Sequence, residues 1–259
     1  MATCTACAYS FPIVENYIYK TIDTAAIDEK QTDAEVFFIK SFLKKFPRLY
    51  KILCHTIGGP PVGIAPVTFI KCFASEKIIL NIGSGSKFIR SDIINIDLSP
   101  HKNIDVVADA TELPIKDGTV DVVICESLIE HLPDSSKLIA EMLRILNNNG
   151  YLYLVSPFML GFHASPNDYY RWTDQGLRQL LNNFKDIDIR VIYGPATAFA
   201  NMASEWFAIL LSFNLRFLYV FWLLLFLTIL SPLKLLDFLL VKYKNSSKIA
   251  MGFVAIAKK

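Results

Sequence analysis

The stretch KIILNIGSGSKFIRSDIINIDLSPHKNIDVVADATELPIKDGTVDVVICESLIEHL, residues 77–132, decides the fold of this chain. It opens with an apolar run at residues 78–82 that ends at Gly83 and Gly85, as expected for a buried strand leading into a tight turn. Three further apolar runs follow, and each ends on an acidic residue: Asp97, Asp109 and Glu126. Ligands of an open parallel sheet bind outside the carboxyl ends of its strands. The stretch therefore predicts a binding edge for a neutral or cationic nucleoside ligand, with glycines that let the ligand approach the backbone.

This ordered set of motifs resembles the core of the class I S-adenosylmethionine (SAM)-dependent methyltransferases, in the subgroup that includes small-molecule and quinone methyltransferases. The resemblance covers about residues 76–194, and the glycines, the two aspartates, VDVVICES and EHLPD carry it. It implies an enzyme that transfers a methyl group from SAM, its cofactor. It also implies an α/β fold with a Rossmann-like, mostly parallel seven-stranded sheet and helices on both faces.

The resemblance also implies a role for each motif residue. The glycine loop would pass under the methionine part of SAM, and Asp97 matches the acid that holds both ribose hydroxyls. Asp109 and Ala110 match the pair beside the adenine, whereas Glu126 and Ser127 would lie beside the cofactor and face the substrate. The expected cofactor-binding residues are Asn81, Gly83, Ser84, Gly85, Asp97, Leu98, Asp109, Ala110, Glu126 and Ser127.

The glycine loop departs from the family pattern in three ways. Asn81 stands where the family usually has an acid, and Lys87 stands where a third glycine is often found. Asp97 follows Gly83 closely, whereas dinucleotide-binding folds place their acid about 20 residues on. The helix between the first two strands must therefore be very short or absent. A Rossmann-like domain that has lost its ligand is the alternative interpretation.

A second motif, SPFMLGFHASPNDYYRWT at residues 156–173, follows the fifth predicted strand. It leaves the carboxyl end of a central strand, so we expect it to lie over the cofactor edge and to contact substrate. A hydroxyl or phenol acceptor needs a base for its proton, and an imidazole exchanges protons near neutral pH. We predict His163 as this catalytic base, with Asp168 orienting it or acting instead. The alternative is an ordered loop whose polar groups satisfy one another.

Two other features near this motif leave alternatives open. Tyr169, Tyr170 and Trp172 would form the walls of a site for a flat or apolar substrate. His131 either faces the active site or makes a structural hydrogen bond. We assign no metal ligand.

Residues 1–75 are predicted to form an N-terminal extension. Cys4 and Cys7 form a Cys-x-x-Cys pair, which is half of a tetrahedral zinc site and resembles part of a small zinc ribbon. Because no second pair follows, two free thiols on a degenerate ribbon are the favoured interpretation. Residues 28–53 predict an amphipathic helix with a basic face. This helix would lie on a membrane surface, cover the substrate or pack against the sheet.

The amino-acid composition gives no reason to expect a nucleic-acid partner, and it suggests association with a membrane. The net charge is +2, from 26 basic and 24 acidic residues, which gives no reason to expect nucleic acid. Five cysteines without a dense pattern indicate a reducing, cytosolic setting. The mean hydropathy of +0.38 is high for a soluble protein and suggests a membrane segment.

An apolar insertion at about residues 203–243 lies between the predicted sixth strand and a last strand at residues 249–257. Its longest uninterrupted apolar part, residues 217–230, is shorter than the ~20 residues that cross a bilayer. We predict a monotopic, membrane-embedded helix pair hinged at Ser231 and Pro232. A transmembrane helix is the second choice.

These features predict a methyltransferase domain at residues 76–259 that is bound to the cytoplasmic face of a membrane. Its acceptor would be a lipid-linked or apolar small molecule. One alternative is a methyltransferase of a soluble substrate with a membrane anchor, and another is a catalytically silent SAM-binding scaffold. An NAD-dependent dehydrogenase fits less well, because the glycine spacing is wrong and no substrate domain is recognisable.

Overall fold

The computed structural model describes residues 59–259, except Ser86, His101 and residues 164–166, together with the backbone of four short N-terminal strands. These strands are β1 (Ala2–Thr3), β2 (Ser10–Phe11), β3 (Ile13–Val14) and β4 (Tyr17–Tyr19). The predictions for Cys4, Cys7 and the helix at residues 28–53 lie outside the described residues.

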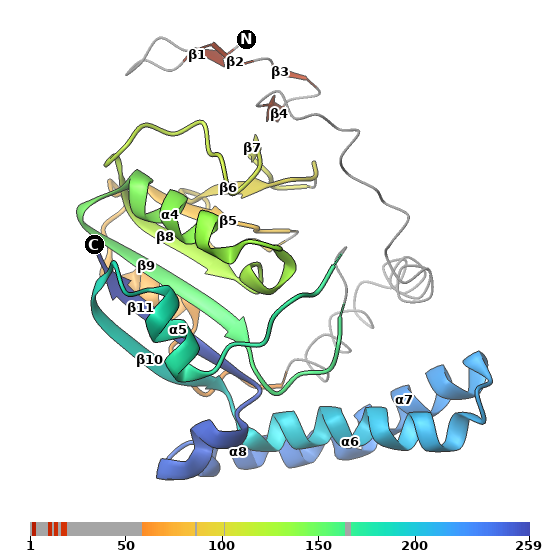
Figure 1. Ribbon diagram of the computed structural model, residues 1–259. Helices are drawn as coiled ribbons and strands as arrows, with labels where there is room; N and C mark the ends of the chain where they lie inside the picture. The colour runs from red at the N-terminus through yellow and green to blue at the C-terminus, as the bar shows by residue number, and fades with distance from the viewer. Residues whose placement is uncertain are drawn as a thin grey trace.

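Seven strands form the core of the sheet, and helices pack against it or project from it (Figure 1). The strands are β5 (Ile79–Ile82), β6 (Ile94–Asp97), β7 (Val106–Val107), β8 (Val120–Glu126), β9 (Leu146–Pro157), β10 (Lys185–Tyr193) and β11 (Gly252–Lys258). The α-helices are α3 (Pro66–Phe69), α4 (Ser135–Ile145), α5 (Asp174–Leu180), α6 (Pro195–Ser212), α7 (Arg216–Leu230) and α8 (Asp237–Leu240). The 3-10 helices are η3 (Ile70–Cys72), η4 (Ile129–His131), η5 (Ser231–Leu236) and η6 (Lys244–Ile249).

The strand order confirms the predicted Rossmann-like sheet. The order is β10-β11-β9-β8-β5-β6-β7, and β4 and β3 extend the sheet beyond β7. Neighbours from β9 to β7 are parallel, whereas β11 is antiparallel to both β9 and β10. The C-terminal strand therefore returns into the sheet as predicted. The extension by β4, parallel to β7, and by β3 was not predicted from the sequence.

Both faces of the sheet are covered, because the buried strands are apolar on both sides. In β8, Val123 and Cys125 point into a core shared with α4 and α5. Val122 and Ile124 point to the opposite face, where Phe69 and Ile70 of the α3–η3 segment cover them. Near-continuous apolar strands of this kind are typical of parallel sheets between helical layers. The predicted helices on both faces are therefore confirmed.

A loop that begins with a tight turn, without a helix among its described residues, connects β5 to β6. The backbone N–H groups of Gly83 and Ser84 both donate to the carbonyl of Ile96, over 2.9 and 3.1 Å. This turn is the short connection that the spacing from Gly83 to Asp97 predicts.

The apolar insertion forms a helical hairpin of α6 and α7 that projects from the sheet (Figure 1). The chain reverses at residues 213–215, where Phe213 and Asn214 have positive φ angles of 48° and 60°. The predicted hinge at Ser231 and Pro232 is therefore wrong. That segment forms η5, which follows the end of α7. The insertion also begins earlier than predicted, at Pro195.

Two charged residues of the insertion are buried where the hairpin meets the sheet. The Asp237 carboxylate accepts hydrogen bonds from the N–H groups of Ala196 (2.7 Å) and Thr197 (2.9 Å), so it caps the N-terminus of α6. A Cβ atom on Gly194 would overlap this carboxylate. The Lys234 ammonium donates to Asn201 Oδ1 over 2.7 Å. These two charges fix the segment after α7 to the N-terminal half of α6 at the base of the hairpin.

One helical run within the described residues is long and apolar enough to cross a membrane, judged by length and composition alone. It is Arg216–Leu240, with 25 residues and a mean hydropathy of 2.1 in its most apolar window. The run comprises α7, η5 and α8, and 17% of that window is buried inside the protein.

Candidate functional site

The glycine turn after β5 leaves room for a ligand over the carboxyl end of the sheet. Gly83 and Gly85 have φ angles of +67° and +53°, a conformation that favours glycine. A Cβ atom on Gly83 would lie 2.8 Å from Leu128 Cδ2, so a side chain does not fit there. A Cβ atom on Gly85 would meet no described atom within 4 Å. The turn is therefore closely packed at Gly83 and open at Gly85.

Asp97, the last residue of β6, is joined to this turn. Its carboxylate accepts hydrogen bonds from the N–H groups of Gly85 (2.8 Å) and Ser99 (3.0 Å). A carboxylate has about four acceptor positions, so further hydrogen bonds from a ligand remain possible. The neighbouring Leu98 side chain is exposed.

Two of the predicted cofactor residues face the interior of the sheet. Asn81 is buried, and its Nδ2 donates to Asn95 Oδ1 over 3.1 Å. Ser84 is also buried, with its hydroxyl 3.4 Å from the carbonyl of Ile96. Both side chains link β5 and its turn to β6. Asn81 thus replaces the acid that is usual in the family, and its amide hydrogen-bonds within the sheet.

The other predicted cofactor residues lie at the ends of β7 and β8. Asp109 is exposed, and its carboxylate accepts from the N–H and hydroxyl of Thr111, while Ala110 packs against the core. Glu126 is 11% exposed and lies 3.5 Å from the Lys87 ammonium. Ser127 follows with a positive φ of 53°. Lys87, which stands where the family often has a glycine, thus brings a positive charge to this edge.

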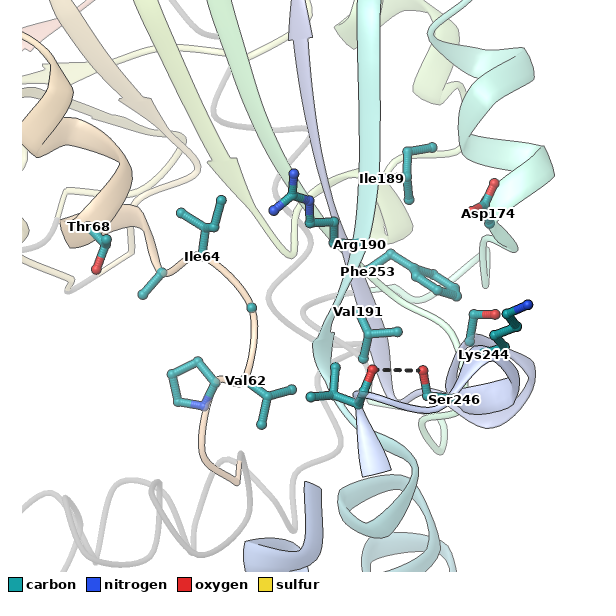
Figure 2. Close-up of a pocket in the computed structure, with 15 residues that line it drawn as sticks. Val62, Ile64, Thr68, Asp174, Ile189, Arg190, Val191, Lys244, Ser246 and Phe253 are labelled. Atoms are coloured by element: carbon teal, nitrogen blue, oxygen red, sulfur yellow. Dashed lines mark hydrogen bonds between the residues drawn. The ribbon is translucent and has the colours of Figure 1, made fainter. Parts of the chain in front are cut away.

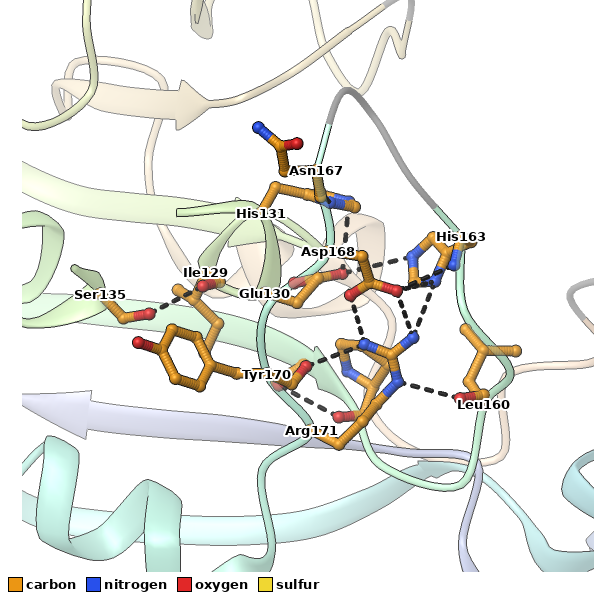
Figure 3. A network of polar contacts seen from close by, with 12 residues as sticks. Ile129, Glu130, His131, Ser135, Leu160, His163, Asn167, Asp168, Tyr170 and Arg171 are labelled. Atoms are coloured by element: carbon orange, nitrogen blue, oxygen red, sulfur yellow. Dashed lines mark hydrogen bonds and ion pairs between the residues drawn. The ribbon is translucent and has the colours of Figure 1, made fainter. Parts of the chain in front are cut away.

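The loop after β9 brings His163 and Asp168 together, as its sequence predicts (Figure 3). Asp168 accepts from the N–H of His163 over 2.8 Å, and the Arg171 guanidinium donates to both of its carboxylate oxygens. Burial raises the pKa of Asp168, but these hydrogen bonds outweigh burial and hold its pKa below the usual range. Asp168 is therefore an ionised anchor of the loop.

Two residues that the sequence left unassigned or ambiguous, Glu130 and His131, complete this cluster (Figure 3). The Glu130 carboxylate is fully buried, and Nε2 of His131 and of His163 lie 3.8 and 3.7 Å from its Oε1. The two imidazole rings are 5.1 Å apart between centroids. The structure thus places His131 beside His163. Its position in the EHLPD segment, directly after Glu130, was the only signal in the sequence.

A separate cavity of about 740 Å³ lies at the β10 edge of the sheet (Figure 2). The segment before α3 forms one wall, where the N–H of Val62 donates to the carbonyl of Ile192 over 2.9 Å. Arg190 and Val191 of β10, together with Lys244 and Ser246, form other walls. This cavity contains none of the predicted site residues, which lie at the carboxyl ends of the central strands.

Comparison with known families matches residues 82–154 to a methyltransferase domain. This segment is similar to SAM-dependent methyltransferases. Two curated relatives, both named probable S-adenosylmethionine-dependent methyltransferase and from two strains of Mycobacterium tuberculosis, are 35% identical over 65 residues. That match covers 25% of this chain and 24% of each relative, so the chain spans about a quarter of their length.

Solved structures of methyltransferases are also similar to this chain. Phosphoethanolamine N-methyltransferase 2 of Haemonchus contortus, in complex with SAM, is 18% identical with a TM-score of 0.47, covering 80% of this chain and 56% of that one. A SAM-dependent methyltransferase from Archaeoglobus fulgidus is 15% identical with a TM-score of 0.44, covering 86% of this chain and 94% of that one. The family match confirms the predicted family, whose cofactor is SAM.

Proposed function

We propose that this protein is a SAM-dependent methyltransferase held on the cytoplasmic face of a membrane, with a lipid-linked or apolar small molecule as its acceptor. The methyl-transfer part rests on the family match over residues 82–154. The membrane part rests on one observation: an apolar helical hairpin projects from the same sheet that carries the predicted cofactor edge (Figure 1).

The cofactor edge offers a group for each part of SAM. Asp97 has acceptor positions for the ribose hydroxyls, and Asp109 lies at the end of the next strand for the adenine. The methionine end of SAM carries an ammonium and a carboxylate. Glu126 and Lys87 carry the matching opposite charges at this edge. We assign them to the methionine end, because Asn81 is buried in the sheet and carries no charge.

The loop of His163 is assigned to the acceptor. Asp168 is fully engaged by Arg171, so we give it a positioning role for the His163 ring. His163 is 38% exposed and is the group placed to draw the proton from an acceptor hydroxyl. Tyr169 and Tyr170 are exposed beside it, and Tyr170 packs near Trp172 with ring centroids 5.4 Å apart. These aromatic surfaces suit a flat or apolar acceptor.

The outer surface of the hairpin carries large apolar side chains, and its buried side carries small residues. Large side chains of both helices and of the turn are exposed, among them Ile209 (65%), Phe213 (78%) and Phe217 (68%). Soluble monomers rarely expose contiguous apolar patches of this extent. The buried side of α6 carries small residues at every fourth position: Ala200, Ser204, Ala208 and Ser212. Stripes of small residues let helices approach closely inside membranes.

The sheet topology favours a hairpin within one leaflet over a crossing. The insertion leaves the sheet at β10 and returns at β11, which pairs with β10 along its length. In the proposed arrangement both ends of the insertion therefore lie on one side of the bilayer, which argues against a single crossing. Helix α6 has 18 residues and α7 has 15, or about 27 and 22 Å of helix, each shorter than the ~30 Å hydrocarbon core. The longer run Arg216–Leu240 continues through η5 and α8, where Lys234 and Asp237 are buried and bind α6 at the base of the hairpin.

Incubation of the protein with labelled SAM and a fractionated membrane extract tests the proposal. We expect label in the lipid-extractable fraction. Label in a water-soluble compound would favour a soluble acceptor, with the hairpin serving only as an anchor. Tight SAM binding without label transfer to any fraction would favour a catalytically silent scaffold.

A further inference from the structure

The Glu130 carboxylate is buried and has no hydrogen-bond partner within the part of the chain that the structure describes. An ionised carboxylate in such a place is strongly unfavourable unless a positive charge compensates it. The nearby cationic side chains are engaged elsewhere, because Arg171 binds Asp168 and Lys87 lies against Glu126. The groups that face Glu130 are instead two imidazoles.

Both imidazoles direct Nε2 toward Glu130. Nδ1 of His131 lies 2.6 Å from the carbonyl of Asn167, which only accepts, so Nδ1 carries the proton and Nε2 is free. Nδ1 of His163 lies 3.4 Å from the Gly161 carbonyl, an acceptor, and 3.2 Å from the Arg171 guanidinium, which only donates. Metal binding by His163 requires the tautomer with its proton on Nδ1. In that tautomer, Nε2 of each ring is left to face the carboxylate.

We propose that Glu130, His131 and His163 bind a divalent transition-metal ion such as Zn²⁺. Their three ligand atoms lie within 4.8 Å of one another. Two imidazole nitrogens and one carboxylate oxygen are an established ligand set for catalytic zinc. Histidines that bind metals usually donate their other N–H to a carbonyl or carboxylate, as His131 does to Asn167, and Nδ1 of His163 lies 3.4 Å from Asp168 Oδ2.

The spacing fits an ion better than a shared proton. The distances of 3.8 and 3.7 Å from Glu130 to His131 and His163 are too long for hydrogen bonds, which span about 2.7–3.2 Å. Two bonds of about 2.0–2.2 Å that meet at one ion span such a gap. The His163 side chain is 38% exposed, so its ring has room to adjust when an ion binds.

The site deepens the proposed function, on which this step rests. Three protein ligands leave a fourth position open, as in catalytic zinc sites, and the exposed His163 places that position toward the acceptor side. A hydroxyl bound there loses its proton to water more readily, because the ion stabilises the resulting oxyanion. With the ion bound, His163 would help to remove the acceptor's proton by holding that ion beside the hydroxyl.

The test is metal binding by the full-length protein. Protein stripped with a chelator is titrated with Zn²⁺ by calorimetry, and Co²⁺ absorption reports the ligand field. We expect one ion per chain. Glu130→Gln and His163→Ala should each weaken binding at least tenfold, whereas Asp188→Asn, a matched change at a surface carboxylate on β10, should leave it unchanged.

SAM affinity measured in the same samples separates this inference from the proposed function. His163→Ala is the deciding variant, because its exposed side chain is not needed to fill a core. A wild-type protein that binds SAM but no ion overturns the metal site alone. Equal ion affinity in wild type and His163→Ala, with SAM binding intact, also overturns it. A wild-type protein that binds the ion but not SAM would leave the metal site standing and remove the methyltransferase.

Discussion

The N–H of Gly85 donates to the Asp97 carboxylate over 2.8 Å, so the end of β6 holds the glycine turn that follows β5. One side chain thus links the two motifs that the family resemblance assigns to the methionine and ribose parts of SAM. The link also orients the carboxylate before any ligand arrives, which lowers the entropy cost of binding.

Asp97→Ala should weaken SAM binding about tenfold to a hundredfold. The variant removes hydrogen bonds to a charged acceptor, which are worth about 1.5–3 kcal/mol. Calorimetry with SAM on the purified protein measures the change. Asp188→Ala, which removes a carboxylate from the surface of β10, serves as the control. Unchanged affinity in a folded Asp97→Ala protein would remove Asp97 from the cofactor site.

Gly83→Ala should lose SAM binding and stability together, whereas Gly118→Ala should cost little. Both glycines have a φ of +67°, so both substitutions carry the same backbone strain, about 1–2 kcal/mol. Only at Gly83 does the new Cβ meet a neighbour, Leu128 Cδ2 at 2.8 Å. The difference between the two variants in melting temperature and SAM affinity isolates the packing beneath the turn. Equal losses would mean that backbone strain alone accounts for both.

His163→Ala should lower turnover far more than it lowers SAM affinity. The side chain lies with Glu130 and Asp168 in the cluster that we assign to the acceptor, and the glycine turn contributes no hydrogen bond to it in the described structure. A loss of a hundredfold or more in kcat is the scale expected for a group that handles the acceptor's proton. Steady-state kinetics and SAM calorimetry on the same protein give the two numbers. A parallel loss of both would place His163 in the cofactor pocket or in the fold.

Sequence patterns predicted the parts of this molecule that local chemistry determines. The apolar runs that end at Gly83, Asp97 and Glu126 predicted where strands end. Parallel strands buried on both faces must be apolar throughout, so the first glycine or acidic residue marks the end of each strand. The return of residues 252–258 to the sheet followed from the family resemblance. His163 and Asp168 were predicted together, since they lie five residues apart in one polar loop.

Tertiary contacts decided what the sequence could not predict. Glu130 looks like an ordinary helix residue in EHLPD, and only the approach of the later loop with His163 makes it part of a cluster. The hinge was placed at Pro232, a usual breaker, but the chain turns at Phe213 and Asn214 instead. In the sequence, Asp237 only interrupts an apolar stretch. In the structure, it caps a helix that begins 42 residues earlier, at Pro195.

Asp121→Asn should destabilise the fold in a pH-dependent way. The Asp121 carboxylate accepts from the Ile78 N–H (2.9 Å), Lys77 (3.1 Å) and Asn147 (2.9 Å). Burial raises the pKa of Asp121, but these donors outweigh burial and lower it below 3.8. The carboxylate therefore stabilises the fold above its unfolded pKa, and this contribution is lost as the pH falls through the folded pKa.

The measurement for Asp121 is urea unfolding at several pH values. Near pH 6–7 the variant should be less stable than wild type by about 1 kcal/mol. The difference should shrink below about pH 4, where the wild-type carboxyl takes up its proton. Asp188→Asn, at a surface pair, is the control. A difference that stays constant down to pH 2 would mean that shape and not charge explains the loss.

Phe213→Asp combined with Phe217→Asp should release the protein from membranes while leaving SAM affinity unchanged. Both side chains are more than two-thirds exposed at the turn of the hairpin, far along the chain from the glycine turn. Burying one Phe in an apolar phase contributes about 1.5–3 kcal/mol, so losing two should reduce partitioning at least a hundredfold. Flotation with vesicles of phosphatidylcholine and phosphatidylserine measures it.

Val67→Asp is the matched control for the hairpin variant, because Val67 is an exposed apolar residue of α3 outside the hairpin. If it releases the protein equally, added charge and not the hairpin explains the result.

Both termini should lie on the same side of the membrane. The reason is that β11, which follows the insertion, pairs with β9 and β10, which precede it. Protease sites placed before Met1 and after Lys259 should be cut from the same side of sealed vesicles. Cleavage from opposite sides would require a spanning helix, and β11 would then have to leave the sheet.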